Sequence, residues 1–282
     1  MARQSDDALA NEQSAGNSQQ DATDQPPRKK PKNAFTELMS QKSSTPKSEP
    51  PSALKPKLRA MESITSGRDG LLAYIKNPQS FTSSSVISYD DHWVLIHDLY
   101  PKSSVHLLLL SRDSKFYNAH PYVACKDATF LMAAKVEIAK ARGIVASELR
   151  RIYGKDSISD SARQEAMESE DPPEVLPEGR DWDKEVMTGV HADPSMNHLH
   201  FHILSNDRHS PCLKHRKHYN SFNTHFFVPV DDLPLDENDE RQHASKFLSD
   251  DMICWRCGKN FKNQFAKLKL HLEEEFQAWK KE

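Results

Sequence analysis

The sequence predicts an α+β fold with an antiparallel sheet, flanking helices, a small C-terminal piece and a disordered N-terminal tail. Three observations carry this prediction. Short apolar runs separated by turn residues indicate strands between residues 85 and 112 and again between 185 and 232. One long helical pattern occupies 127–154. Polar residues with few apolar neighbours fill 1–60.

The first strands follow a short helix. Residues 66–77 have the pattern of an amphipathic helix, and Pro78 ends it. Residues 85–91 and 92–101 are expected to form two strands around an Asp-Asp turn, and 104–112 a third, mostly apolar strand. The long helix at 127–154 has only Gly143 as an interruption.

An acidic segment at 156–185 interrupts this pattern. It contains eleven acidic residues, three basic residues and three prolines. It has little apolar surface to bury, so it is predicted to form an insertion or loop. Strand character resumes through 185–205, and 221–232 are expected to form a closing strand. The acidic stretch 231–240 then leads to a compact, Lys-rich C-terminal piece.

The first 60 residues lack a sustained apolar period, in a chain of 282 residues that is 37% hydrophobic, and we predict that they are disordered. PPRKKPK (26–32) holds four basic residues, which favours a nuclear-import signal over an ordinary solvated stretch. NAFTELM (33–39) is either a helix that binds a partner such as a repair protein, or a chance apolar cluster. The sequence shows no apolar run of about 18 residues and no secretory segment. We therefore expect a soluble, intracellular and nuclear protein with no membrane association.

Three histidines alternate in NHLHFHILSND (197–207). Successive strand side chains point to opposite faces, so His198, His200 and His202 share one face and Leu199 and Phe201 the other. A zinc site is one explanation, but three histidines on a straight strand do not readily converge on one ion. A cluster of hydrogen-bonded structural histidines is another. The strict alternation, with a serine and a further histidine just upstream, favours catalytic machinery.

The motif resembles the signature of the histidine triad (HIT) superfamily of nucleotide hydrolases and transferases. YPKSSVHLLLL (100–110), VHADPSMNHLHFHILS (190–205) and SPCLKHRKHYNSFNTHFF (210–227) are more particularly similar to the aprataxin branch, whose members remove AMP from DNA 5′ ends. The resemblance covers about 66–282. It implies a HIT-type antiparallel sheet and, as partner, nicked or double-stranded DNA that carries a 5′-adenylate.

The resemblance also implies a chemical role for the middle histidine. His200 would attack the α-phosphorus of the adenylate with one ring nitrogen while a backbone carbonyl holds the other. The DNA 5′-phosphate leaves, AMP stays on the histidine, and water then releases AMP as product. No metal is expected at this catalytic site. The positions that match family residues near the phosphate are His198, His202, Ser195 and Lys217, with His191 and His209 as plausible neighbours.

Upstream, HDLYPKSSVH (97–106) carries three further positions that match the family. The resemblance puts Asp98 near the adenosine pocket, together with apolar residues around Leu95 and Ile96. Lys102 and His106 are expected to shape and support the site. The alternatives are a solvated turn lysine and a core histidine. Cys212 has no base beside it in the sequence and is not expected to be a nucleophile.

The C-terminal piece begins with a Cys-x-x-Cys pair, Cys254 and Cys257, and His271 follows after thirteen intervening residues. This spacing is typical of a zinc finger. A second histidine is absent, but Glu275 lies one helical turn beyond His271 on the same face. We predict one structural zinc ion held by two cysteines, one histidine and this glutamate. Glu274 is the alternative fourth ligand, and a redox Cys-x-x-Cys is the competing interpretation.

Four lysines lie in the loop and helix of this piece. They suit contacts to backbone phosphates better than reading of base edges, although a solvated helix face would have the same composition. The expected DNA-binding residues are Lys259, Lys262, Lys267 and Lys269.

The expected organisation is a tail (1–60), a catalytic HIT domain (61–232) with the acidic insertion, and a linker with the zinc finger (233–282). The expected function is removal of AMP from 5′-adenylated DNA ends, which are products of abortive ligation. Two rival functions stay open. One is a general HIT hydrolase of small adenylates, and the other is a non-catalytic DNA-binding scaffold in which the histidines are structural.

Overall fold

The computed structural model describes residues 67–282. The predicted disorder of 1–60, the basic cluster at 26–32 and the apolar island at 33–39 lie outside the described residues.

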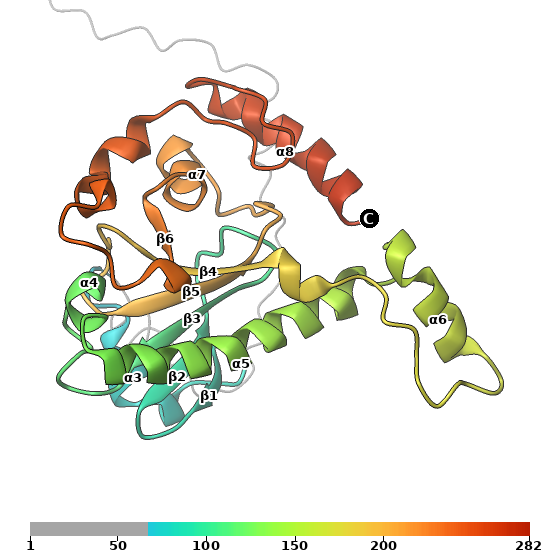
Figure 1. Cartoon of the computed structure of the whole chain (residues 1–282), viewed down its shortest axis with the longest axis horizontal. Helices are drawn as coiled ribbons and strands as arrows, with labels where there is room; N and C mark the ends of the chain where they lie inside the picture. The colour runs from blue at the N-terminus through green and yellow to red at the C-terminus, as the bar shows by residue number, and fades with distance from the viewer. Residues whose placement is uncertain (1–66) are drawn as a thin grey trace, which may run out of the picture. The chain divides into compact units, whose positions relative to one another are not determined.

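Within 67–282, six strands form one sheet in the order β1-β2-β3-β5-β4-β6 (Figure 1). Every neighbouring pair is antiparallel, which confirms the predicted fold class. The first two strands form the expected hairpin around Asp90 and Asp91. The strands are β1 (Val86–Tyr89), β2 (Trp93–His97), β3 (His106–Ser111), β4 (Val186–His191), β5 (His200–Ser205) and β6 (Phe227–Pro229).

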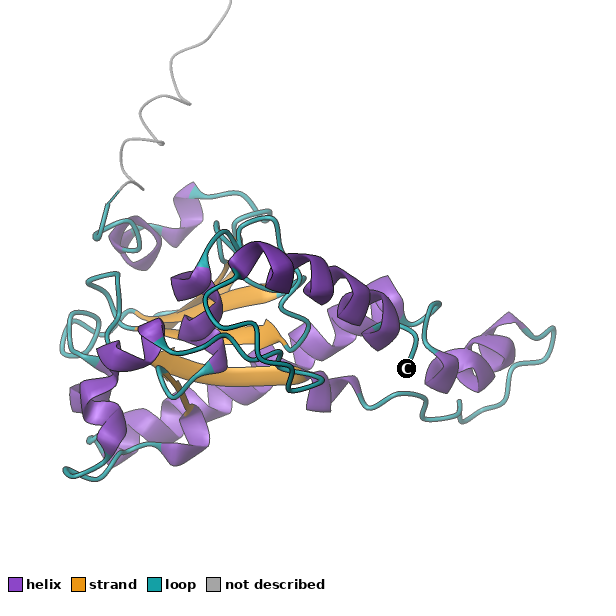
Figure 2. Ribbon diagram, turned by 90° about the horizontal axis from the view of Figure 1, so that it is seen from above, coloured by secondary structure: helices purple, strands orange, loops and turns teal. Residues whose placement is uncertain are grey.

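Helices lie on both sides of this sheet (Figure 2). The long helix α5 (Ala128–Tyr153) starts at Asp127, whose carboxylate accepts a hydrogen bond from the amide N–H of Phe130 and so caps the helix. No helix in the described part of the chain combines the length and the apolar character of a membrane span. The other helices are α3 (Leu72–Lys76), α4 (Pro121–Ala124), α6 (Ser161–Glu168), α7 (Arg216–Asn223) and α8 (Phe265–Trp279), with 3₁₀ turns η1 (Pro78–Ser80), η2 (Ile158–Asp160), η3 (Trp182–Glu185), η4 (Val230–Asp232) and η5 (Glu240–Ser249).

The strand alternation divides the core into two layers. Leu107, Leu109 and Phe201 pack on the α5 side of the sheet. Leu108 and Leu110 point to the opposite face, where α3 covers them. Register extends this division to the histidines, because Leu110 pairs with His200 and Leu108 with His202. The triad strand therefore presents its histidines on the α3 side.

The acidic segment is more ordered than a solvated loop. Its middle is exposed, as its composition predicts, but Ser157 and Asp160 near its start and Arg180 and Trp182 near its end are buried. Asp160 is fully buried and accepts hydrogen bonds from the Trp182 ring N–H at 2.7 Å and the Arg180 amide at 2.8 Å. Gly179 has φ +72° and lies against Asp160, where a Cβ would meet the carboxylate. The Asp160 carboxylate can be buried because these donors satisfy its hydrogen-bonding capacity.

The ends of the acidic segment also hold the C-terminal helix. The Arg180 guanidinium lies over the rings of Trp182 and Trp279, 4.4 and 4.9 Å from their centroids. It donates to the Trp279 carbonyl at 2.7 Å and to Glu185 at 2.9 Å. Tyr153, at the end of α5, contacts Trp279 edge to face. We call Tyr153, Arg180, Trp182, Glu185 and Trp279 the aromatic clamp.

The predicted closing strand at 221–232 is mostly a different structure. Residues 221–223 end α7, and only Phe227–Pro229 pair with β4 as a strand. The 3₁₀ turn Val230–Asp232 follows. The polar run NSFNTH allowed a helix here, and β-branched or aromatic residues concentrate only at 226–228.

Candidate active site and metal centre

A cavity of about 400 Å³ opens on the α3 side of the sheet. Its walls come from α3, the end of β2, the loop before β5, β5 itself and α7. The predicted site residues that line it are Asp98, Lys102, His191, Ser195, His200 and His202, and the other lining residues include Gly67, Leu71, Tyr74, Ile96, Met196, His218, Ser221 and Phe222.

His200 has a fixed tautomer. Its Nδ1 lies 2.7 Å from the backbone carbonyl oxygen of His198. A carbonyl only accepts, so Nδ1 carries the proton and Nε2 keeps its lone pair. Burial lowers the pKa of His200, and the hydrogen bond to the carbonyl opposes part of this effect. The ring is therefore neutral and oriented on the cavity wall, a state in which it can act as a base or a nucleophile.

His202 belongs to a chain of polar contacts. Its Nδ1 lies 2.9 Å from Nε2 of His106. On the far side, Nδ1 of His106 is 3.3 Å from Asp98 Oδ2 and 3.2 Å from the amide nitrogen of Lys102. Burial lowers the pKa of His106 to about 4, so this ring is neutral at pH 7. Nε2 of His202 is buried and has no hydrogen-bond partner among the described residues.

Two tautomers fit this chain. If His106 Nδ1 accepts from the Lys102 amide, its Nε2–H donates to His202 and leaves a proton on His202 Nε2. If His106 Nδ1–H donates to Asp98 instead, both protons shift and His202 Nε2 becomes an acceptor. His202 Nε2 can therefore either donate or accept one proton at the cavity wall.

His191 and His198 complete the cluster in different ways. The ring of His191 lies 4.4 Å from that of His202 between centroids, and its Nε2 has no partner among the described residues. Burial lowers the pKa values of His191 and His202 well below the usual range. His198 precedes β5, is buried and stacks on Tyr117. Its backbone carbonyl is the part that reaches His200.

The lysines and the serine predicted near the phosphate take different positions. Lys102 is half-buried on the cavity wall, and burial lowers its pKa while Asp98 raises it. Ser195 is exposed at the cavity lining. Lys217 is exposed on α7 and is not among the lining residues. His209 also lies outside the lining, because its ring stacks on Phe276 of α8 at 3.8 Å between centroids.

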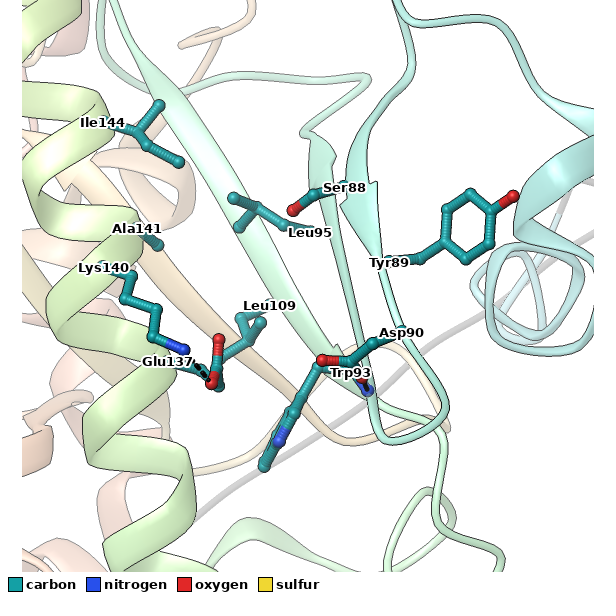
Figure 3. Close-up of a pocket in the computed structure, with 10 residues that line it drawn as sticks. All are labelled: Ser88, Tyr89, Asp90, Trp93, Leu95, Leu109, Glu137, Lys140, Ala141 and Ile144. Atoms are coloured by element: carbon teal, nitrogen blue, oxygen red, sulfur yellow. Dashed lines mark hydrogen bonds and ion pairs between the residues drawn. The ribbon is translucent and has the colours of Figure 1, made fainter.

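The α7 wall of the cavity was not predicted from the sequence. His218, Ser221 and Phe222 line it, and burial lowers the pKa of His218 to about 4. The only available signal was their position inside the SPCLKHRKHYNSFNT motif. The expectation for Leu95 was wrong, because this residue points to the α5 face and lines a separate, smaller cavity with Trp93 and Leu109 (Figure 3). Ile96, one residue later, does face the active-site cavity.

The four predicted metal ligands come together at the C-terminal finger. One donor atom from each of Cys254, Cys257, His271 and Glu275 lies within 4.8 Å of all the others. His271 Nε2 is 3.1 Å from Cys257 Sγ and 3.1 Å from Glu275 Oε1. Two sulfurs, an imidazole and a carboxylate are ligands that zinc accepts. The set therefore fits zinc.

The fourth position is occupied by Glu275 and not by its neighbour. Glu275 is buried, and Arg256 donates to its Oε2 at 2.6 Å, which leaves Oε1 directed at His271. Glu274 is exposed and reaches only within 3.9 Å of the other ring nitrogen of His271. Residues four apart on a helix lie on the same face, so Glu275 is within reach of His271.

The finger lysines divide into two groups. Lys259, Lys262 and Lys267 are exposed. Lys269 is half-buried, and its Nζ donates to the backbone carbonyls of Ser210 and Leu213 at 2.7 and 2.8 Å. Three of the four predicted lysines are thus free to meet solvent or a polyanion.

Two known families match parts of the chain. Residues 223–278 match the family described as C2HE / C2H2 / C2HC zinc-binding finger. Residues 162–218, which include the triad, match the family described as scavenger mRNA decapping enzyme C-term binding.

The sheet, the buried histidine cluster and the finger together define a histidine-triad protein with a C2HE zinc-binding finger. The chain is 36% identical to an aprataxin-like protein of Schizosaccharomyces pombe, over 75% of this chain and 82% of that protein. It is 34% identical to one of Saccharomyces cerevisiae, over 76% of this chain and 97% of that protein. The crystal structure of the aprataxin ortholog Hnt3 in complex with DNA has a TM-score of 0.61 and 34% identity, over 75% of this chain and 96% of that one. The chain belongs to the aprataxin family.

Proposed function

We propose that this protein hydrolyses 5′-adenylated DNA ends and releases AMP and DNA with a 5′-phosphate. The observation that supports the proposal most directly is the hydrogen bond from His200 Nδ1 to the backbone carbonyl of His198. This bond leaves one nucleophilic nitrogen on the wall of a nucleotide-sized cavity. The aprataxin ortholog Hnt3 has also been solved with DNA and guanosine, which supports a nucleic-acid substrate.

In the first step, the lone pair on His200 Nε2 attacks the α-phosphorus of the adenylate. A nitrogen–phosphorus bond forms, and the bond from that phosphorus to the oxygen of the DNA 5′-phosphate breaks. The DNA leaves with both electrons of the broken bond. The phosphorylated ring is cationic because Nδ1 keeps its proton, and the His198 carbonyl stabilises that charge.

In the second step, a water molecule attacks the same phosphorus and the nitrogen–phosphorus bond breaks. The electron pair returns to His200 Nε2, and the proton of the water must go to a base. His202 Nε2 receives it, because the chain through His106 can switch this nitrogen to an acceptor. Lys102, on the same wall, offsets the charge that develops on the phosphoryl oxygens.

The exposed finger lysines would hold the DNA. Lys259, Lys262 and Lys267 can contact backbone phosphates without selecting a sequence. One structural zinc ion would be held by the four clustered ligands and would fold the finger.

No metal is proposed at the catalytic site, although Asp98, His106 and His202 have donor atoms within 4.8 Å of one another. The 2.9 Å separation of the two ring nitrogens is that of a hydrogen bond. The proposed steps use only the lone pairs and protons of His200, His202 and His106, so they require no metal.

The direct test uses nicked DNA with a 5′-adenylate at the nick. Wild type should convert it to 5′-phosphate DNA, and His200→Ala should not. When the reaction is stopped early in a denaturant without acid, AMP should be found bound to wild-type protein and not to His200→Ala. Equal catalytic efficiency on adenylated DNA and on a small dinucleoside polyphosphate would instead identify a general nucleotide hydrolase. Failure to process either substrate would identify a non-catalytic protein.

Nuclear localisation and a repair-protein partner for 1–60 are also proposed, from the basic cluster at 26–32 and the apolar island at 33–39. A fluorescent fusion should lose nuclear accumulation when the four basic residues Arg28, Lys29, Lys30 and Lys32 are changed to Ala. Unchanged accumulation in that variant would contradict the import signal.

A further inference from the structure

Helix α7 has two working faces. One face lines the active-site cavity with His218, Ser221 and Phe222. An adjoining face packs on the zinc finger through Tyr219, which is fully buried among finger residues. The helix has only eight residues, too few to hold a position in water by itself. Its placement beside the cavity therefore depends on what it packs against.

Tyr219 joins α7 to the metal-binding turn. Its Oη donates to the Ile253 carbonyl at 2.8 Å and accepts from the Trp255 amide at 2.9 Å. These two residues flank the ligand Cys254. A neighbouring side chain, Asn220, donates to the Asp250 carbonyl at 2.8 Å. These hydrogen bonds join the metal-binding turn directly to α7.

Lys269 makes a second connection, from the finger helix to the loop before α7. Its Nζ donates to the carbonyls of Ser210 and Leu213. Leu213 is itself buried in the cluster that contains Tyr219 and Cys254. The carbonyl of Cys212, between these two acceptors, lies 3.2 Å from Nδ1 of His218. The loop at 210–213 thus connects Lys269 to His218 on the cavity wall.

We propose that Lys269 and Tyr219 are positioning residues that hold the α7 wall of the nucleotide cavity against the zinc finger. The finger is then part of the catalytic pocket as well as a surface for DNA. Two of the three Lys269 donors are used within the protein, so a phosphate contact is not its main role. The proposal rests on the proposed function only in taking AMP as the ligand of the cavity.

The first test compares two lysines of the same helix in the full-length, zinc-loaded protein. Lys269→Met should speed amide hydrogen exchange in 210–219. Lys267→Met removes the same charge from an exposed site and should leave that exchange at the wild-type rate. Wild-type exchange in Lys269→Met would overturn the proposal. This measurement needs no substrate, so it can be interpreted even if the protein does not act on DNA.

The second test measures AMP binding by calorimetry, with metal analysis on the same samples. Lys269→Met and Tyr219→Phe should weaken AMP binding roughly tenfold, the effect of losing one or two hydrogen bonds, while each retains zinc. AMP affinity equal to wild type in both variants would overturn the proposal. Wild type that binds AMP but leaves adenylated DNA intact would overturn the proposed function and leave this comparison valid.

Discussion

Nδ1 of His200 donates to the backbone carbonyl of His198 at 2.7 Å. The two residues belong to the same alternating motif, so the segment that carries the proposed nucleophile also fixes its tautomer. This bond separates the roles of the histidines, because the first contributes its backbone and the second its ring. The third, His202, is instead oriented by His106 on the neighbouring strand β3.

The chain from Asp98 to His202 gives the first prediction. His106→Gln should lower kcat on adenylated DNA by roughly 100-fold, because His202 loses the ring that exchanges a proton with it. Binding of AMP should change much less. Steady-state kinetics and calorimetry test this, with thermal unfolding as the control for folding. A variant with wild-type kcat would eliminate the proton chain from the mechanism.

The pH dependence of kcat/KM should follow from the protonation state of His200, the proposed nucleophile. Burial lowers the pKa of His200, and in the proposed mechanism the neutral ring is the form that attacks phosphorus. The acidic limb of kcat/KM should therefore lie below 6.5, the usual histidine value. Measurement from pH 4.5 to 8.5 on adenylated nicked DNA tests this. A limb at or above 6.5 would contradict the depressed pKa.

Stability should also depend on pH. His106 has its pKa lowered to about 4 in the folded protein, and unfolding restores a value near 6.5. Between these values the unfolded chain binds more protons, so the free energy of unfolding falls as the pH drops from 6.5 toward 4. His191 and His202 act in the same direction. Urea titrations at pH 7.5 and 5.5 should show this loss, and His106→Gln should reduce it.

The metal centre makes a sharp distinction between adjacent glutamates. Glu275→Ala should lower zinc affinity at least tenfold and destabilise the finger, because it removes a buried ligand. Glu274→Ala is the matched control, since its side chain is exposed, and should keep wild-type zinc content. Titration with a competing chelator measures both. Equal losses in the two variants would contradict the assignment of the fourth ligand.

The aromatic clamp should contribute measurably to stability. Arg180→Met should cost about 1–3 kcal/mol, because it removes the buried guanidinium that donates to Glu185 Oε1 and to the Trp279 carbonyl. Arg151→Met is the control, since Arg151 is an exposed surface partner of Glu148, and should leave the free energy of unfolding close to that of wild type. Urea denaturation monitored by tryptophan fluorescence compares them. A larger loss in Arg151→Met than in Arg180→Met would refute the clamp.

The sequence predicts those parts of the fold and site that depend on short-range patterns. The hairpin around Asp90, the helix at 128–153 and the alternation of His200 and His202 all follow from periods of two or 3.6 residues. The set of zinc ligands follows from spacing, because Cys254 and Cys257 share a turn and His271 and Glu275 share a helix face, but spacing alone left Glu274 as an alternative fourth ligand.

Contacts between distant segments were not predictable in this way. No pattern indicates that Lys269 bonds to carbonyls 56 and 59 residues away, since a helix lysine is equally common in solvent. The acidic composition of 156–185 likewise hides the burial of Asp160 and Trp182, which depends on donors supplied by the fold. His209 was expected near the phosphate from its place in the motif, yet it stacks on a helix that the motif does not contain.

The aromatic clamp bears on how this protein can be divided. A fragment that ends at residue 232 would keep Tyr153, Trp182 and Arg180 but lose Trp279, and would open part of the main core to water. Such a fragment should aggregate when expressed alone. The finger is therefore not an independent module that could be transferred to another hydrolase. A shortened version of this protein would have to keep residues 67–282.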